Sequence, residues 1–112
     1  MNIKNLDVLL LRRIVTDVKN ECLDRIIEVI LYGSYAKGTA TLKSDIDILV
    51  ILKGSLEKSE DFENVPVTDE ETMWKRYNKL IHLCYIAEAD YLNGKEKELR
   101  DVPSYGVSIM SI

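Results

Sequence analysis

Two aspartates, Asp45 and Asp47, open a strongly apolar run that ends at Leu52. Alternate side chains of a strand project to one face, so the two carboxylates would share a face with Cα atoms roughly 6–7 Å apart. Oxygen ligands suit Mg²⁺ or Mn²⁺, and Mg²⁺ usually completes its shell with water and substrate phosphates. Without a cation the two charges would repel each other wherever they are partly removed from water. The pair therefore predicts a metal site, although an isolated Asp-x-Asp more often just marks the start of a strand.

A glycine-punctuated turn precedes this pair. Gly33 and Ser34 end the β-branched run Ile26–Tyr32, and Gly38 follows shortly after. A strand that passes here into a helical turn would aim free backbone N–H groups and the Ser34 hydroxyl at an anion. The spacing is not that of a P-loop, because Thr39 stands where that motif needs lysine. We expect a phosphate-binding turn, while Gly-Ser alone is more often a plain corner.

Apolar spacing predicts the elements that must position these residues. Helical spacing over about residues 6–20 indicates a first helix, and strands are expected at Ile26–Tyr32, 45–52 and about 81–86. The order of elements favours an α/β (α+β) fold, with a small mixed sheet of three or four strands and helices mainly on one face. We expect one domain, residues 1–112.

The second half of the chain carries weaker signals. Thr68 and Glu71 form a capping box, which predicts a helix that buries Met73, Tyr77 and Leu80. A weak helix is expected over residues 88–100, since Gly94 interrupts it. A tail begins at Val102-Pro103, and residues 107–112 are candidates for an edge strand.

Composition narrows the classes of function. The chain has 112 residues, of which 46% are hydrophobic and 30% charged, enough for one core. Its net charge of −4 argues against a broad nucleic-acid-binding surface, and its longest apolar stretch is too short to cross a membrane. Cys22 and Cys84 lack the spacing of a zinc site or a disulfide framework, so they predict buried thiols in a reducing, cytoplasmic setting.

The two halves of residues 33–50 together resemble a known pattern. Gly33-Ser34 with Ala36 and Gly38, then Ser44-Asp45-Ile46-Asp47 and Leu49-Val50, is similar to the signature of the DNA polymerase β-like nucleotidyltransferase superfamily. The size resembles the minimal nucleotidyltransferases, small proteins often paired with a HEPN-domain partner. The resemblance implies the fold of that superfamily over most of the chain.

The resemblance also implies a role for each matching residue. Gly33 and Ser34 would hold the β- and γ-phosphates of a nucleoside triphosphate, with Ser44 as a further nucleotide-binding residue. Asp45 and Asp47 would hold Mg²⁺ or Mn²⁺. Lys37 and Lys43 would neutralise phosphate charge, or would simply be solvated loop lysines. The implied reaction moves a nucleoside monophosphate, AMP from ATP, to an acceptor hydroxyl and releases pyrophosphate.

The sequence departs from the family at a third carboxylate, which usually opens a following strand. His82 stands at that position here. Imidazole can ligate a metal ion or act as a base, so His82 would replace the acid, or it would merely begin a buried strand. Glu88 and Asp90 would need a shift in register, and a helix N-terminus already accounts for them.

Two functions follow from this resemblance. The first is Mg²⁺-dependent nucleotidyl transfer, with the acceptor hydroxyl carried by a partner protein. The second is a catalytically weak or inactive nucleotide-binding antitoxin subunit, which neutralises a HEPN-type toxin by contact. The acidic balance disfavours a third, nucleic-acid-binding function, and a homodimer remains an open arrangement.

Overall fold

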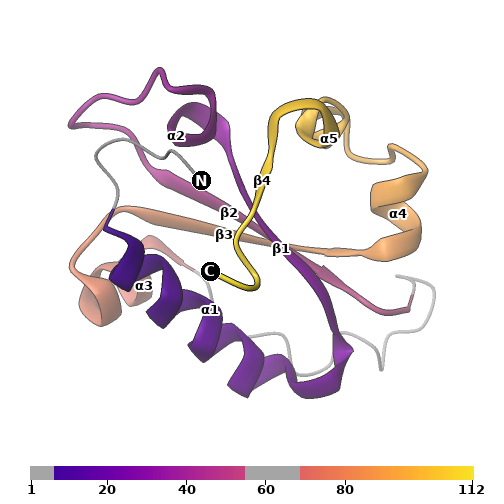
Figure 1. Cartoon of the computed structure of the whole chain (residues 1–112), viewed down its shortest axis with the longest axis horizontal. Helices are drawn as coiled ribbons and strands as arrows, with labels where there is room; N and C mark the ends of the chain where they lie inside the picture. The colour runs from indigo at the N-terminus through magenta and orange to yellow at the C-terminus, as the bar shows by residue number, and fades with distance from the viewer. Residues whose placement is uncertain (1–6, 55–68) are drawn as a thin grey trace.

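A four-stranded mixed sheet forms the centre of the protein (Figure 1). It is seen in a computed structural model that describes residues 7–54 and 69–112. Strand β1 (Ile26–Tyr32) pairs antiparallel with β2 (Ile46–Leu52), and β2 pairs parallel with β3 (Ile81–Ala87). The short strand β4 (Val107–Ser108) lies antiparallel on the other side of β1, so the order is β3-β2-β1-β4. The expected small mixed sheet is confirmed.

The two longest helices cover one face of this sheet (Figure 1). They are α1 (Val8–Cys22) and α3 (Glu70–Tyr77), and a single 3-10 turn, η1 (Leu23–Arg25), leads from α1 into β1. The Asp7 side chain caps α1 by accepting a hydrogen bond from the Leu9 N–H at 2.9 Å. Side chains at helical spacing from α1 and alternate residues of β2 make the main core, among them Leu11, Ile14, Val18, Ile48, Val50 and Leu52.

Short segments cover the opposite face. These are α4 (Glu88–Leu92), the 3-10 turn η3 (Lys97–Leu99) and α5 (Val102–Tyr105). Leu99 and Val102 pack there against Leu49, Ile51 and Ile86 of the sheet. The expected helix over residues 88–100 is therefore wrong in length, because the chain turns at Gly94 (φ +64°). The expected tail contains α5, and the edge strand is limited to β4.

The start of α3 differs from the predicted capping box. Thr68 lies outside the described residues, and Asp69 is the capping residue. The Asp69 carboxylate accepts hydrogen bonds from the Thr72 N–H at 2.9 Å and the Thr72 hydroxyl at 2.8 Å. These bonds hold the pKa of Asp69 below its usual range. Met73 and Tyr77 are buried as predicted, whereas Leu80 lies beyond the helix and is 41% exposed.

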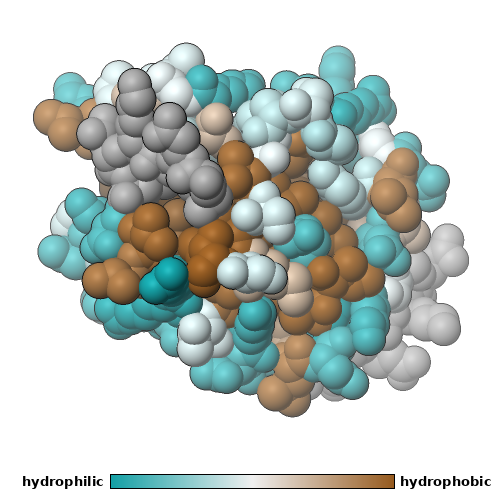
Figure 2. Space-filling view, in the orientation of Figure 1, coloured by the Kyte–Doolittle hydropathy of each residue, from teal (hydrophilic) through white to brown (hydrophobic). Residues whose placement is uncertain are grey.

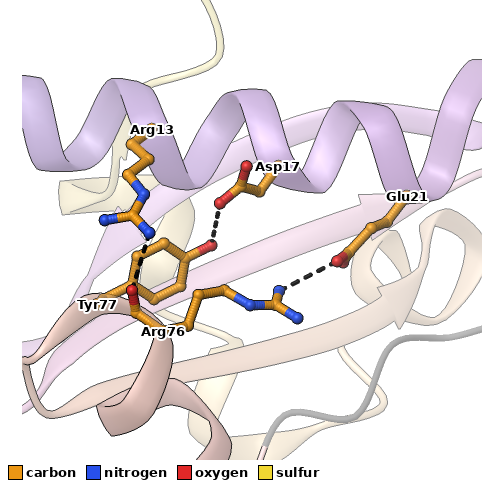
Figure 3. Close-up of polar contacts among 5 residues, drawn as sticks. All are labelled: Arg13, Asp17, Glu21, Arg76 and Tyr77. Atoms are coloured by element: carbon orange, nitrogen blue, oxygen red, sulfur yellow. Dashed lines mark hydrogen bonds and ion pairs between the residues drawn. The ribbon is translucent and has the colours of Figure 1, made fainter.

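Five polar residues link α1 to α3 (Figure 3). We call Arg13, Asp17 and Glu21 of α1, with Arg76 and Tyr77 of α3, the α1–α3 polar cluster. The Tyr77 hydroxyl donates to Asp17 at 2.7 Å, and Arg76 pairs with Glu21 at 3.0 Å. Arg13 donates to the backbone oxygen of Arg76 at 2.9 Å and lies 5.0 Å from the centre of the Tyr77 ring. Each charge in the cluster thus has a partner on the other helix.

None of the helices in the described parts of the chain combines the length and the apolar character needed to cross a bilayer.

Candidate functional site

Strand β1 ends at Tyr32 and is followed directly by the short helix α2 (Gly33–Lys37), which we call the Gly33 turn. Gly33 adopts φ +72°, and a Cβ atom at this position would overlap the carboxylate of Asp47. Only glycine meets both demands, because it tolerates positive φ and leaves room for the neighbouring side chain. The carboxylate of Asp47 is therefore packed against the backbone of the turn.

Strand register brings three predicted site residues to one end of the sheet. Tyr32, which precedes Gly33, is the cross-strand partner of Asp47, and Asp47 is the partner of His82 on β3. The Nδ1 atom of His82 lies 3.4 Å from the Oδ1 atom of Asp47. Gly33, Asp47 and His82 are thus adjacent although three separate segments supply them.

The charge balance at this end of the sheet is unfavourable. Burial raises the pKa of Asp47 above its ordinary value, His82 lowers it in part, and the charge of Asp45 raises it further. The Asp47 side chain is only 25% exposed, whereas Asp45 is exposed just before β2. A cation near the two carboxylates would relieve both the repulsion and the cost of burial.

The donor set fits a metal ion only when other ligands complete it. Within residues 7–54 and 69–112, no three His, Cys, Asp or Glu side chains gather closely enough to hold a metal ion by themselves. Asp45 and Asp47 supply the hard oxygen ligands that Mg²⁺ prefers, and Mg²⁺ is commonly bound by one or two carboxylates plus phosphates and water. The arrangement therefore suits a metal ion that arrives with a phosphate ligand.

The C-terminal part of the chain contributes two residues that sequence reasoning missed. The Gly33 N–H donates to the hydroxyl oxygen of Tyr105 at 3.1 Å, so this N–H is not free as expected. The Nζ atom of Lys37 lies 4.6 Å from the centre of the Tyr105 ring and 3.9 Å from Oδ2 of Asp101. No local pattern signals these contacts, since Tyr105 is 72 residues from Gly33.

Ser34, Lys43 and Ser44, the other residues predicted for nucleotide binding, lie in or beside the loop between α2 and β2. The Ser44 hydroxyl accepts a hydrogen bond from the Thr41 N–H at 2.8 Å, so it closes the turn before β2. The backbone oxygen of Ser34 accepts the Thr39 N–H at 2.9 Å, and Lys43 is exposed. These residues shape or border the approach to β2.

Glu88 and Asp90 do not join the site. They lie in α4, which begins after β3 has crossed the sheet from His82 to Ala87. They are therefore at the opposite end of the strand from the Asp47–His82 pair, and Asp90 pairs with Lys95 at 3.8 Å. His82 is the neighbour of Asp47 on β3, and it stands where the family resemblance implies a third acid.

A groove of about 840 Å³ is lined by residues of α2, of α3 and of the loops that follow them. Of the predicted site residues, Lys37 and Ser44 line it, whereas Asp45, Asp47 and His82 do not. Tyr35, Leu42, Trp74 and Leu80 line it together with Ser44, the neighbour of Asp45. Figure 2 shows apolar surface exposed near the centre of this face of the molecule, with hydrophilic surface around it. Trp74 is 50% exposed and Leu42 is fully exposed, so the groove has apolar walls open to a ligand.

Comparison with known proteins gives a family-level match. A family model described as "Nucleotidyltransferase domain" matches residues 11–107. Two proteins of Methanocaldococcus jannaschii match shorter stretches. "Putative protein adenylyltransferase MJ1305" is 48% identical over 42 residues, which are 38% of this chain and 29% of that protein. "Putative protein adenylyltransferase MJ0604" is 44% identical over 41 residues, 37% of this chain and 41% of that protein. The matches thus span less than half the length of either relative.

Two crystal structures share the fold. A putative nucleotidyltransferase from Sulfolobus solfataricus matches 90% of this chain and 78% of its own, with a TM-score of 0.50 and 22% identity. A mutant of the toxin-antitoxin MntA-HpeT matches 93% of this chain and 73% of its own, with a TM-score of 0.56 and 17% identity. At these identities the likeness concerns the fold.

Proposed function

This chain belongs to the nucleotidyltransferase domain family, and from that premise we propose that it transfers AMP from ATP to an acceptor hydroxyl with the help of Mg²⁺. The observation that carries the proposal is the packing of the Asp47 carboxylate against Gly33, with His82 at 3.4 Å on the next strand. A phosphate-binding turn and a metal-binding acid are useful together only when they are close in space, and the proximity of Gly33 and Asp47 supports the proposal.

The chain's own residues divide the task of binding. Gly33, Ser34 and Lys37 would receive the phosphate tail, and Asp45 and Asp47 would hold Mg²⁺. When bound, the ion neutralises phosphate charge and favours ionisation of the acceptor hydroxyl. The raised pKa of Asp47 is consistent with this assignment, because burial penalises the charged carboxylate and a bound cation would offset that cost.

The reaction needs one proton acceptor. The acceptor oxygen forms a bond to the α-phosphorus, the bond from that phosphorus to pyrophosphate breaks, and the hydroxyl proton must leave. We assign the proton to His82, whose Nδ1 faces Asp47, and propose its Nε2 as the atom that accepts it. Asp47 would orient the ring, as carboxylates commonly do for catalytic imidazoles.

The acceptor that fits best is a hydroxyl on a partner protein. The groove beside Ser44 has exposed apolar walls at Trp74 and Leu80, suited to a peptide segment. Both M. jannaschii relatives are named as adenylyltransferases of proteins, and one fold neighbour is part of a toxin-antitoxin pair. We propose a HEPN-type helical protein as the partner.

One observation favours a second function, an antitoxin subunit without catalytic activity. His82 replaces an acid of the family pattern, so one anionic ligand is missing from the metal site. In that case the chain would bind nucleotide and neutralise its partner by contact alone.

Label transfer separates the two functions. The chain is incubated with Mg²⁺, the protein encoded beside it, and ATP labelled at either the α- or the γ-phosphate. We expect label on the partner from α-labelled ATP only, with loss in Asp47→Asn and reduction in His82→Ala. Asp24→Asn, in the exposed turn η1, is the control and should retain transfer.

The alternative outcomes are equally informative. Transfer that persists in Asp47→Asn would contradict the assignment of the acid pair. Absence of transfer in the wild-type chain, with partner binding retained, would favour the inactive antitoxin. Transfer of γ-label would indicate phosphoryl transfer and overturn the proposed reaction.

A further inference from the structure

Two groups of the Gly33 turn are already engaged by residues of the C-terminal part of the chain. The Gly33 N–H donates to the Tyr105 hydroxyl oxygen at 3.1 Å. The ammonium of Lys37 lies 3.9 Å from the Asp101 carboxylate and 4.6 Å from the centre of the Tyr105 ring. Both partners from the C-terminal part present oxygen acceptors to groups that would otherwise face a phosphate.

The backbone that carries these acceptors is firmly held. Val102 is fully buried, and its carbonyl accepts the Gly106 N–H at 2.6 Å. Gly106 lies so close to Ile30 that a Cβ atom would come within 2.7 Å of its methyl group. To break the contacts with Gly33 and Lys37, the side chains of Tyr105 and Asp101 would therefore rotate, while α5 stays in place.

The two contacts differ in strength. Lys37 and Asp101 are 47% and 62% exposed, and exposed ion pairs contribute little. Tyr105 is half-buried and packs against the apolar cluster under α5, so its hydrogen bond is better shielded from water. We therefore expect the Tyr105 contact to stabilise the ligand-free Gly33 turn more than the Asp101 contact does.

We propose that Tyr105 and Asp101 occupy, in the nucleotide-free chain, the positions at Gly33 and Lys37 that nucleotide phosphates take over. This inference rests on the proposed function, which assigns Gly33 and Lys37 to the phosphate tail. A phosphate oxygen replaces the phenol oxygen as acceptor of the Gly33 N–H, and the Tyr105 hydroxyl oxygen loses that hydrogen bond. The internal contacts lower the affinity for phosphate, because a ligand must break them before it makes its own.

Substitution of Tyr105 tests the exchange with inorganic tripolyphosphate and Mg²⁺ as the probe, measured by isothermal titration calorimetry. Tyr105→Phe keeps the ring but removes the acceptor, so we expect about fivefold tighter binding than in the wild type. Asp101→Asn, at an exposed position, should tighten binding about twofold. Tyr91→Phe is the matched control, since Tyr91 packs against the same apolar cluster, and its affinity should be unchanged.

A second readout follows the hydrogen bond itself. Amide hydrogen exchange at Gly33 should be about fivefold faster in ligand-free Tyr105→Phe than in the wild type, and tripolyphosphate should slow it in both. A residue that merely supports the fold would not produce tighter binding when its hydroxyl is removed.

The outcomes separate this inference from the proposed function. If the wild type binds tripolyphosphate and Tyr105→Phe binds it equally or more weakly, the exchange is wrong and the proposed function stands. If Tyr105→Phe fails to fold, the Asp101→Asn titration decides in the same way. If the wild type binds neither tripolyphosphate nor ATP with Mg²⁺, both proposals fail.

Discussion

The α1–α3 polar cluster and the strand-end site, which consists of Gly33, Asp47 and His82, differ in how their charges are balanced. In the cluster, the Asp17 carboxylate accepts from Tyr77 at 2.7 Å, and Glu21 pairs with Arg76 at 3.0 Å (Figure 3). At the strand ends, the Asp47 carboxylate is largely buried, and His82 offsets only part of the cost of burying its charge. Burial raises its pKa, and the charge of Asp45 adds to the effect.

This difference indicates what each region does. The cluster joins two helices on the outside of the sheet, where each charge is satisfied within the chain. The strand-end site keeps an unfavourable carboxylate beside a glycine turn, and a cation with a phosphate ligand would satisfy both. We therefore expect the cluster to support helix packing, and under the proposed function we expect the strand-end site to bind the nucleotide and the metal ion.

The largest expected effect separates the two regions by their carboxylates. Asp47→Asn should reduce nucleotidyl transfer about a thousandfold, or about 4 kcal/mol in activation free energy, because it removes a metal ligand and the partner of His82. Asp17→Asn should leave transfer within about twofold, since the cluster only supports helix packing. Label transfer from α-labelled ATP measures the activity of both variants. Equal losses of activity in the two variants would contradict the assignment of different roles to the two regions.

The second prediction concerns the two glycines that flank α2. Gly33→Ala should lower the free energy of unfolding by about 3 kcal/mol, since the new Cβ is strained at positive φ and overlaps Asp47. Gly38→Ala, at φ +77° with open space around it, should cost about 1 kcal/mol from strain alone. Urea unfolding provides the measurement, and similar costs for both would remove the argument for close packing of Asp47.

The third prediction tests the cluster. Tyr77→Phe removes the hydroxyl that donates to Asp17, so we expect a loss of about 1 kcal/mol and a Tm lower by roughly 4 °C. Burial and the neighbouring carboxylate raise the pKa of Tyr77 to about 12. The contribution should therefore be complete below pH 10.0, and be lost as pH rises toward 12. Thermal unfolding at several pH values would contradict this if the difference vanished near neutrality.

The smallest effect is the pH dependence of the metal-free strand-end site. Because the folded-state pKa of Asp47 lies above its ordinary value of 3.8, protonation favours the folded chain. Stability from this group is complete below pH 3.8 and is lost as pH rises through the folded-state pKa. The difference in stability between Asp47→Asn and the wild type should thus grow by less than about 1 kcal/mol from pH 4 to 7, and Mg²⁺ with ATP should abolish it. A difference that shrank over this range would show the opposite shift.

Much of the fold could be predicted because its strands carry strong local signals. The apolar runs around β1, β2 and β3 predicted the three strands. The predicted shared face of Asp45 and Asp47 stays a prediction, because Asp45 lies just before β2 begins at Ile46. The position of His82 beside Asp47 follows from the parallel register of β2 and β3, which the strand patterns did not predict; His82 was identified through the family resemblance.

The rest depends on tertiary contacts without a local pattern. The chain leaves α4 at Asn93 and turns through Gly94, where Arg100 reaches back to donate to the glycine carbonyl at 2.6 Å. This turn brings α5 to the sheet and sets Tyr105 against Gly33, and neither event has a signature in the sequence around it. Asp69 likewise took the capping role that was expected of Thr68, because helix boundaries shift easily by a residue.

Paramagnetic broadening by Mn²⁺ in the presence of ATP tests the central claim most directly. Backbone amide signals of Gly33, Ser34, Asp47 and His82 should broaden strongly, and only when ATP is present, while the amide of Asp17 in the α1–α3 polar cluster stays sharp. Broadening centred on the cluster, or an unchanged signal at Asp47, would contradict a metal-bound triphosphate at the strand ends.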